Sequence, residues 1–232
     1  MKIFGISDLH LDSKKEKPMD VFGKNWENHD LRIFEDWHQK VNQNDIVLMP
    51  GDISWAISLK EAELDLRTID HLPGRKVISK GNHDYWWTSL TKMKAYEFDS
   101  IFFLHNNCFQ SDDFVVYGTR GWLTQDGDDF RVEDNKIVKR ELIRMNNSFK
   151  SEISYDSKLK IAMLHFSPFD SKGELNVFGE LICKQNIDIC LYGHLHGKDG
   201  HRNVKEGLVE KTRFICVAAD YVNFKLKEIV EI

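Results

Sequence analysis

The chain has 232 residues, of which 41% are hydrophobic and 30% carry charges of both signs, so the composition excludes a disordered or fibrous protein. A formal net charge of -5 and a pI near 6.1 argue against general binding to nucleic acids or membrane surfaces, which is typical of basic proteins. Cations bound at one place would offset part of this charge, so the balance does not exclude an anionic substrate.

The first residues, the length of the apolar runs and the cysteines together predict a cytoplasmic location. The first residues run directly into a strand-like segment without the charged and apolar regions of a signal peptide, and no apolar run approaches the roughly 18 residues of a membrane span. The four cysteines have no zinc-site spacing, and in a chain of this size reduced thiols fit better than a disulfide framework. Because no linker or repeat interrupts the sequence, we expect one domain over residues 1–232.

The first hundred residues predict strands that alternate with helices. Short apolar runs with turn residues after them predict three strands, at Lys2–Ser7, Ile46–Met49 and Lys76–Ser79. Helical spacing of apolar residues predicts three helices, at Leu31–Val41 after an Asp30 cap, after Ser58 with Glu61 in a capping box, and at Tyr85–Tyr96. The polar segment Ser13–Asn28 is expected to be a loop.

The remainder of the chain adds short neighbouring strands and two helices. Strands are expected at Ile101–Leu104, Cys108–Gln110, Phe114–Tyr117, Leu159–Leu164, Ile187–Tyr192, Leu208–Val209, Arg213–Ala218 and Phe224–Val230. Helices are expected at Glu133–Glu152 and Glu174–Lys184, an acidic turn at Asp126–Asp129, and a loop at Gly200–Glu206. This order favours an α/β sandwich of two mixed sheets with helices outside.

Five of the predicted strands are followed by residues that can bind metal ions. In open α/β sheets, ligands bind beyond the carboxyl ends of the strands, where loops from several strands meet. A single Asp or His at such a place is more commonly structural, but five cases at five strand ends are hard to assign to structure alone. The residues are Asp8 and His10, Asp52, Asn82 and His83, His165, and His194 and His196.

The chemistry of these side chains indicates which metals they would bind. Carboxylate and amide oxygens with imidazole nitrogens suit Mn, Fe, Zn or Co, and the absence of thiolates argues against a structural zinc site. Even without His83, seven ligands remain, which exceed the needs of one ion but would serve two if a carboxylate bridges them. Two cations about 3.5–4 Å apart can activate a water and stabilise an in-line displacement at phosphorus.

The same residues carry a resemblance to a known family. Asp8-Leu9-His10, Gly51-Asp52, Gly81-Asn82-His83-Asp84, His165 and Gly193-His194-Leu195-His196 resemble, in order, the five motifs of the calcineurin-like metallophosphoesterases. The resemblance implies a four-layer α/β/β/α sandwich of two mixed β-sheets flanked by helices. It also implies a phosphoesterase with a dinuclear centre of two divalent or trivalent metal ions, with Mn, Fe or Zn as the leading candidates.

The resemblance also implies a role for each motif residue. It assigns Asp8, His10 and His196 to one metal, Asn82, His165 and His194 to the other, and Asp52 to a bridge between them. His83 would face the scissile phosphate as general acid or charge stabiliser, and Asp84 would orient the imidazole of His83. The nucleophile would be a hydroxide held between the metals.

Residues outside the motifs leave alternatives open. Arg120, between glycines after a strand, is expected either to bind a phosphate oxygen or to be a surface arginine in a turn. The helix Glu133–Glu152 could be a lid, a dimer contact or a plain outer helix. Four tryptophans could wall the site or pack in the core, and Asp12 and His201 are interpreted as structural or solvated. The tryptophans are Trp26, Trp86, Trp87 and Trp122.

Three functional hypotheses follow. The leading one is a metal-dependent hydrolase that cleaves a phosphomonoester or phosphodiester. The second is a catalytically silent scaffold of the same fold for protein–protein contact, although a scaffold has no need of His83 and Asp84. The third is a nuclease that acts on short fragments, since the acidic charge disfavours extended nucleic-acid binding. The sequence leaves the substrate, the native metals and the oligomeric state undecided.

Overall fold

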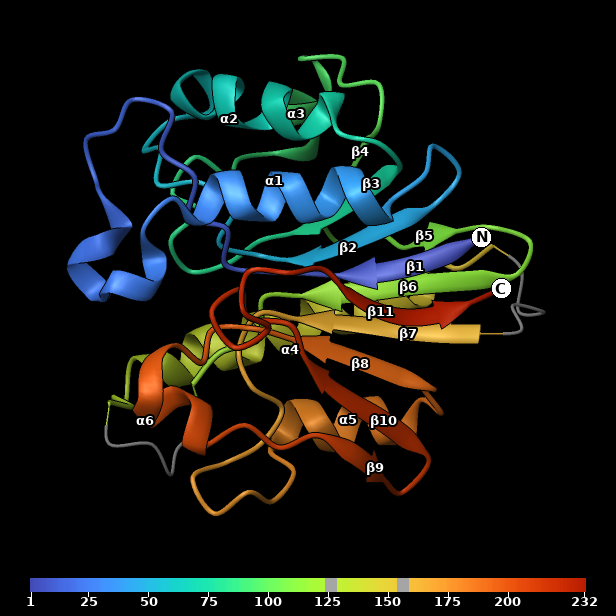
Figure 1. Ribbon diagram of the computed structural model, residues 1–232. Coiled ribbons are helices and arrows are strands. Elements are labelled where there is room, and N and C mark those ends of the chain that lie inside the picture. The colour runs from blue at the N-terminus through green and yellow to red at the C-terminus, as the bar shows by residue number, and fades with distance from the viewer. Residues whose placement is uncertain (124–128, 154–158) are drawn as a thin grey trace.

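The computed structural model describes residues 1–123, 129–153 and 159–232, and in these ranges two β-sheets pack face to face (Figure 1). The first sheet has the strand order β11-β1-β2-β3-β4, in which β1 to β4 are parallel and β11 is an antiparallel edge strand. Its strands are β1 (Lys2–Gly5), β2 (Ile46–Pro50), β3 (Arg75–Ser79), β4 (Ile101–Leu104) and β11 (Lys227–Glu231).

The second sheet has the order β5-β6-β7-β8-β10-β9, with a parallel centre and antiparallel strands at both edges. Its strands are β5 (Phe109–Gln110), β6 (Phe114–Thr119), β7 (Leu159–Leu164), β8 (Ile189–Tyr192), β9 (Gly207–Val209) and β10 (Thr212–Cys216). The parallel strands β1, β2, β7 and β8 point to the left of Figure 1, and both chain termini lie at the opposite end.

Helices cover the outer face of each sheet and complete four layers. Three apolar clusters fill the spaces between the layers: one under α1 and α2, with Trp37 and Leu66, one between the sheets, with Leu48 and Leu191, and one under α4 and α5, with Met145. The helices are α1 (His29–Lys40), α2 (Leu59–His71) and α3 (Leu90–Lys94) on the first sheet, and α4 (Asp134–Lys150) and α5 (Val177–Lys184) on the second. The predicted sandwich fold is confirmed.

Side-chain hydrogen bonds cap the first turns of α2 and α5, whereas the N-cap residue of α1 makes none. Ser58 caps α2 by accepting a hydrogen bond from the backbone N–H of Glu61 at 3.3 Å, as the capping-box pattern predicts. The cap of α1 was expected at Asp30, but Asn28 occupies that position and α1 already begins at His29. Asn176 caps α5 and accepts hydrogen bonds from two backbone N–H groups, so this helix begins at Val177 and not at Glu174.

The helix expected at Tyr85–Tyr96 is mostly wrong, since only the five residues of α3 are helical. The indole of Trp86 donates to the Asp84 carboxylate at 3.0 Å, and the indole of Trp87 donates to His105 at 2.8 Å. The first contact is local and the second is tertiary; together they hold residues 85–89 outside helical geometry, and both tryptophans are buried in the core. Neither tryptophan walls the candidate site.

Two expected loops contain short helices. The segment Ser13–Asn28 includes the 3-10 helices η1 (Met19–Phe22) and η2 (Lys24–Trp26), and part of the loop expected at Gly200–Glu206 belongs to α6 (Gly197–Arg202). Of the acidic turn expected at Asp126–Asp129, residues 126–128 lie outside the described residues.

Helix α4 is an outer layer of the sandwich and packs on β6. Its buried face includes Glu141, Met145 and Ser148. All four cysteines lie in the described ranges and are free. In the described parts of the chain, every helix is too short or too polar to cross a membrane.

Candidate metal centre

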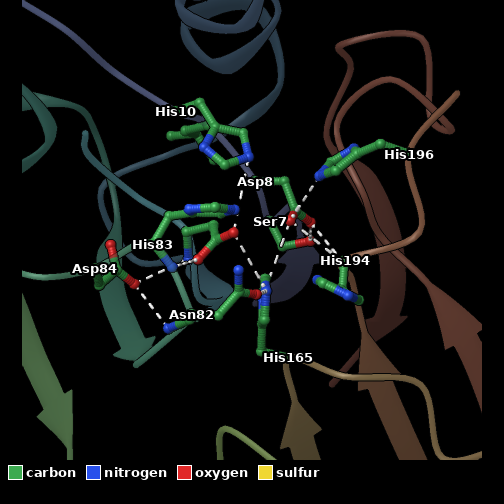
Figure 2. A network of polar contacts seen from close by, with 12 residues as sticks. Ser7, Asp8, His10, Asn82, His83, Asp84, His165, His194 and His196 are labelled. Atoms are coloured by element: carbon green, nitrogen blue, oxygen red, sulfur yellow. Dashed lines mark hydrogen bonds and ion pairs between the residues drawn. The ribbon is translucent and has the colours of Figure 1, made fainter. Parts of the chain in front are cut away.

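The loops that follow five parallel strands meet where the two sheets approach each other. Ser7, just beyond β1, pairs with Ala218, just beyond β10, and so joins the two sheets at their carboxyl edge. Figure 2 shows that the side chains of Asp8, His165 and His196 point toward one another at this edge. The loops after β1, β2 and β3 supply Asp8, His10, Asp52 and Asn82, and those after β7 and β8 supply His165, His194 and His196.

Backbone hydrogen bonds between these loops fix their positions. The N–H of Asp8 donates to the carbonyl of Gly51 at 2.9 Å, and the N–H of His10 donates to the carbonyl of Asp52 at 3.0 Å. Asp8, His10, Asp52 and His194 have φ angles of 60°, 46°, 54° and 69°, in the left-handed region that non-glycine residues rarely adopt. Such backbone strain is common at functional sites, where the surrounding structure holds it in place.

Two motif glycines allow the loops to approach closely. A Cβ atom on Gly81 would lie 2.0 Å from Oδ1 of Asp52, and a Cβ atom on Gly193 would lie 2.4 Å from Oδ2 of Asp8. Any side chain at either position would therefore displace a predicted ligand. The glycines of these motifs are explained by close packing against carboxylates.

Two groups of side chains have donor atoms close enough to share a metal ion. Asp8, His10 and His196 form one group, and Asp8, Asp52 and His165 form the other, with the donor atoms of each group within 4.8 Å of one another. Asp8 belongs to both groups. Oδ2 of Asp52 lies 3.8 Å from Nε2 of His10 and 3.3 Å from Nε2 of His165, and so between the two groups.

Asn82 and His194 adjoin the second group. The side-chain oxygen of Asn82 lies 2.7 Å from Nε2 of His165. The ring of His194 lies 5.1 Å from that of His165, centroid to centroid, and its backbone N–H donates to Oδ2 of Asp8 at 3.1 Å. All seven predicted ligands are thus brought to one place.

The charges of this cluster are strongly coupled. Burial opposes the negative charges of Asp8 and Asp52, but the nearby imidazoles outweigh burial and hold the pKa of both carboxyls well below its usual range. In turn the neighbouring carboxylates outweigh the burial of His165 and His196 and raise the pKa of these imidazoles to about 9 and about 10. The buried carboxylates of Asp8 and Asp52 therefore require positive charge beside them.

Bound cations fit this requirement. Metal binding would place positive charge beside the carboxylates and release the protons of His165 and His196. Burial lowers the pKa of His10 to about 4, and burial with the neighbouring His165 lowers that of His194 to about 3, so both rings are neutral, as metal ligands must be. Among the described residues, Oδ2 of Asp52 and Nδ1 of His10 are buried without a hydrogen-bond partner. The residues present fit a metal site of oxygen and nitrogen donors.

The structure corrects the contacts predicted for Asp84. Its carboxylate accepts hydrogen bonds from the backbone N–H groups of Asp52 at 2.9 Å, Ile53 at 2.8 Å and Gly81 at 2.7 Å, besides that from the indole of Trp86. Nδ1 of His83, by contrast, is buried without a hydrogen-bond partner in the described ranges. Backbone N–H groups and an indole occupy the carboxylate of Asp84. Asp84 therefore positions the loop that carries Asp52 and does not orient the imidazole of His83.

Asp220 supports the site and was not predicted. It accepts a hydrogen bond from Nδ1 of His196 at 2.8 Å and another from the backbone N–H of Gly197 at 2.8 Å, and it also pairs with His201 at 3.0 Å. A carboxylate behind a ligating histidine fixes the orientation of the ring. Asp220 follows the strand β10, so the strand-end rule that selected the other residues could have found it. His201, interpreted as structural, contacts this supporting group.

Ser7 and Trp55 are further neighbours of the cluster that the sequence did not single out. The hydroxyl of Ser7 donates to Oδ2 of Asp8. The indole of Trp55 stacks on His10 with ring centroids 4.7 Å apart and lies 4.5 Å from the ring of His83. For Trp26 the sequence left open whether the side chain walls the site or packs in the core. Trp26 is buried, and its ring lies 5.5 Å from the ring of His196, centroid to centroid.

Arg120 lies beside the cluster and is largely buried, so it is not a surface arginine. Its guanidinium lies 3.6 Å from the buried Glu141 of α4 and over the ring of Trp122 at 4.2 Å. Its carbonyl accepts a hydrogen bond from the N–H of His165 at 3.0 Å, which ties its loop to the site.

The sequence profile of the calcineurin-like phosphoesterases matches residues 1–198, which include all five motifs. The chain belongs to the calcineurin-like phosphoesterase family. The gene 66 proteins of Mycobacterium phages D29 and L5 are 37% and 36% identical to it, over 84 and 78 residues. The matched regions are 35% and 34% of this chain, and they span only 40% and 37% of those relatives.

Solved structures share the fold of this calcineurin-like phosphoesterase. A phosphopantetheinyl hydrolase from Mycobacterium tuberculosis aligns over 100% of this chain and 96% of its own, with a TM-score of 0.59 and 11% identity. A protein from Thermus thermophilus aligns over 98% and 97%, with a TM-score of 0.55 and 14% identity. A protein of unknown function from Aquifex aeolicus aligns over 98% and 95%, with a TM-score of 0.51 and 18% identity. At these identities the likeness concerns the fold alone.

Proposed function

We propose that this protein is a metal-dependent phosphoesterase that hydrolyses a phosphomonoester or phosphodiester at a dinuclear centre. The observation that carries the proposal is the pair of donor groups that share Asp8 at the carboxyl edge of both sheets. Two bound cations would supply an activated water and neutralise the charge that develops at phosphorus.

The proposed ligand sets follow the family assignment, although in the structure Asp8 is close to both groups of donors. Asp8, His10 and His196 would hold one ion, Asn82, His165 and His194 the other, and Asp52 would bridge them. The place of Oδ2 of Asp52 between the rings of His10 and His165 supports the bridge. Mn, Fe and Zn all suit this donor set.

His83 is proposed to act on the phosphate without binding metal. Its backbone N–H donates to Oδ1 of Asp52 at 2.8 Å, and its ring lies against Trp55. Burial lowers the pKa of its imidazole, so at neutral pH the ring is a neutral group that can donate one hydrogen bond to a phosphoryl or leaving oxygen. The guanidinium of Arg120 is proposed as a second phosphate-binding group, and its buried Nε has no hydrogen-bond partner among the described residues.

Metal-defined protein would test the proposal. We expect Mn²⁺ to confer hydrolysis of 4-nitrophenyl phosphate or its phenyl diester, and a chelator to abolish it. His83→Ala should lower kcat by about 10²–10⁴-fold with the metal content unchanged. His38→Ala, which removes an exposed histidine of α1, is the matched control and should leave both unchanged.

Three results would contradict the proposal or one of its parts. Protein that holds two ions per chain and hydrolyses neither monoesters nor diesters would favour the silent scaffold. Loss of both metals in His83→Ala would disprove the separate role of His83. Cleavage of short oligonucleotides alone would favour the nuclease alternative, which the net charge of -5 makes the less attractive one.

A further inference from the structure

A recess with a volume of about 280 Å³ opens directly beside the proposed metal centre. Three imidazoles of the site, those of His10, His83 and His196, form one side of it. A phosphate held at the centre would therefore have the rest of its ester within reach of this recess.

The other walls of the recess are apolar and mostly aromatic. Trp26 and Trp55 lie against the imidazoles, and Met19 and Phe22 of the 3-10 helix η1 close the outer side. The side chain of Phe22 is 67% exposed, although it borders the site. An exposed phenyl group at the edge of an aromatic recess has apolar area to cover, which a ligand can supply.

The side chains that line this recess carry no charge, apart from the imidazoles. Of the described residues that line it, none is an Asp, Glu, Lys or Arg, and Asn25 is the one uncharged side chain with a hydrogen-bonding amide. A group with further charges would lose solvation there without finding a partner. The occupant should therefore be uncharged, apolar and flat.

We infer that the recess binds an aromatic group in the alcohol portion of the substrate, so that the preferred substrates are phosphate esters of alcohols that carry a planar ring. This inference rests on the proposed phosphoesterase function and specifies its substrate class. The phosphate would bind at the centre, and the ring would lie between Trp26, Trp55 and Phe22. The scissile oxygen would then face His83, which belongs to both the centre and the recess.

The first test compares esters whose leaving alcohols have similar basicity. With Mn²⁺-loaded protein we expect kcat/KM for benzyl phosphate to exceed that for ethyl phosphate on the order of tenfold or more. Cyclohexylmethyl phosphate should fall between the two, because it is apolar but not flat. If the protein cleaves only diesters, the methyl diesters of the same alcohols replace the monoesters.

Two variants test whether Phe22 contributes to this preference. Phe22→Ala should reduce the ratio of benzyl to ethyl kcat/KM by about threefold or more. Val21→Ala is the matched control, because Val21 is its neighbour on η1, is 72% exposed and does not line the recess. Equal ratios for wild type and Phe22→Ala, or equal rates for benzyl and cyclohexylmethyl esters, would overturn the inference while the phosphoesterase proposal stands.

A binding measurement separates the two proposals. Titration calorimetry of Mn²⁺-loaded protein should show benzylphosphonate bound about tenfold more tightly than methylphosphonate, with the difference reduced in Phe22→Ala. If no ester is hydrolysed, the phosphoesterase proposal fails, and the ratio of the two phosphonate affinities alone shows whether the recess binds an aromatic group. Equal affinities for the two phosphonates would exclude an aromatic-binding recess.

Discussion

Asp84 shows how a motif residue can act through the backbone. A carboxylate that accepts hydrogen bonds gains about 1.5–3 kcal/mol from each, and Asp84 accepts bonds from three loop N–H groups within 2.9 Å and from one indole. Because one of these donors belongs to Asp52, the position of the proposed bridging ligand depends on Asp84. Burial and the neighbouring charge of Asp52 raise the pKa of Asp84 to about 6, so it remains mostly ionised at neutral pH.

We predict that Asp84→Ala lowers the free energy of unfolding by about 3 kcal/mol or more and weakens Mn²⁺ binding. Urea unfolding and calorimetric titration would measure the two effects. Asp12→Ala is the control, because the carboxylate of Asp12 accepts a hydrogen bond from Lys17 in an exposed loop and belongs to neither group of metal donors. Normal stability and metal affinity with slow turnover would instead support the catalytic role first expected of Asp84.

The residues that the structure brings together at the proposed metal centre could be selected from the sequence because their signal is simple. A polar residue after a buried parallel strand lies at one edge of the sheet whatever the details of its loop. The partners of those residues were not recoverable in this way. The contacts of Asp84, the stacking of Trp55 and the left-handed backbone of Asp8 and His194 depend on how loops from distant strands pack together.

At the scale of elements, the junction of α2 and β3 contains a buried lysine. Nζ of Lys76 donates to the carbonyls of Asp70 at 3.1 Å and Gly74 at 2.8 Å, and also to that of Leu72. The ammonium thus satisfies carbonyls at and beyond the C-terminal end of α2, where no intrahelical partner is left. Burial nevertheless lowers the pKa of Lys76 from 10.5 to about 8.

This shift predicts how stability changes with pH. Between about pH 8 and 10.5 the unfolded chain keeps a proton on Lys76 that the folded chain has lost, so the free energy of unfolding rises with pH in this window. We predict that the advantage of wild type over Lys76→Met grows by about 1–2 kcal/mol from pH 7.5 to pH 9.5 in urea unfolding. The exposed substitution Lys92→Met should show no such change. An unchanged difference for Lys76→Met would mean that the three carbonyls hold the proton.

Helices and strands were predicted well where a local pattern determines them, and less well where a tertiary contact determines the conformation of the segment. The strand Leu159–Leu164 and the capping box at Ser58 are as expected, because periodicity and a nearby acceptor determine them. The expected helix at Tyr85–Tyr96 is shortened to α3, because the indoles of Trp86 and Trp87 bind partners outside the segment. The contact of Trp86 with Asp84 is local, but a single sequence contains no sign of the contact between Trp87 and His105.

For the whole molecule, the proposed metal centre is a further connection between the sheets, besides the apolar layer between them and the backbone bridge from Ser7 to Ala218. Asp8 and Asp52 follow strands of the first sheet, while His165 and His196 follow strands of the second. Without cations, the two buried carboxylates repel each other, and protonated imidazoles must balance them. Ions that bind only the folded chain stabilise it in proportion to the logarithm of their concentration.

We therefore predict that removal of metal lowers the melting temperature and that Mn²⁺ restores it. At a free concentration one hundred times Kd, one ion adds about 2.7 kcal/mol. For a chain of this size, that corresponds to roughly 5–10 °C, measurable by calorimetry before and after chelation. Asp8→Asn should lose most of the Mn²⁺-dependent shift, because Asp8 belongs to both donor groups, while Asp12→Asn should keep it. A melting temperature that does not change when metal analysis shows complete removal would mean that the apolar layers and the backbone bridge between Ser7 and Ala218 hold the two sheets together without metal.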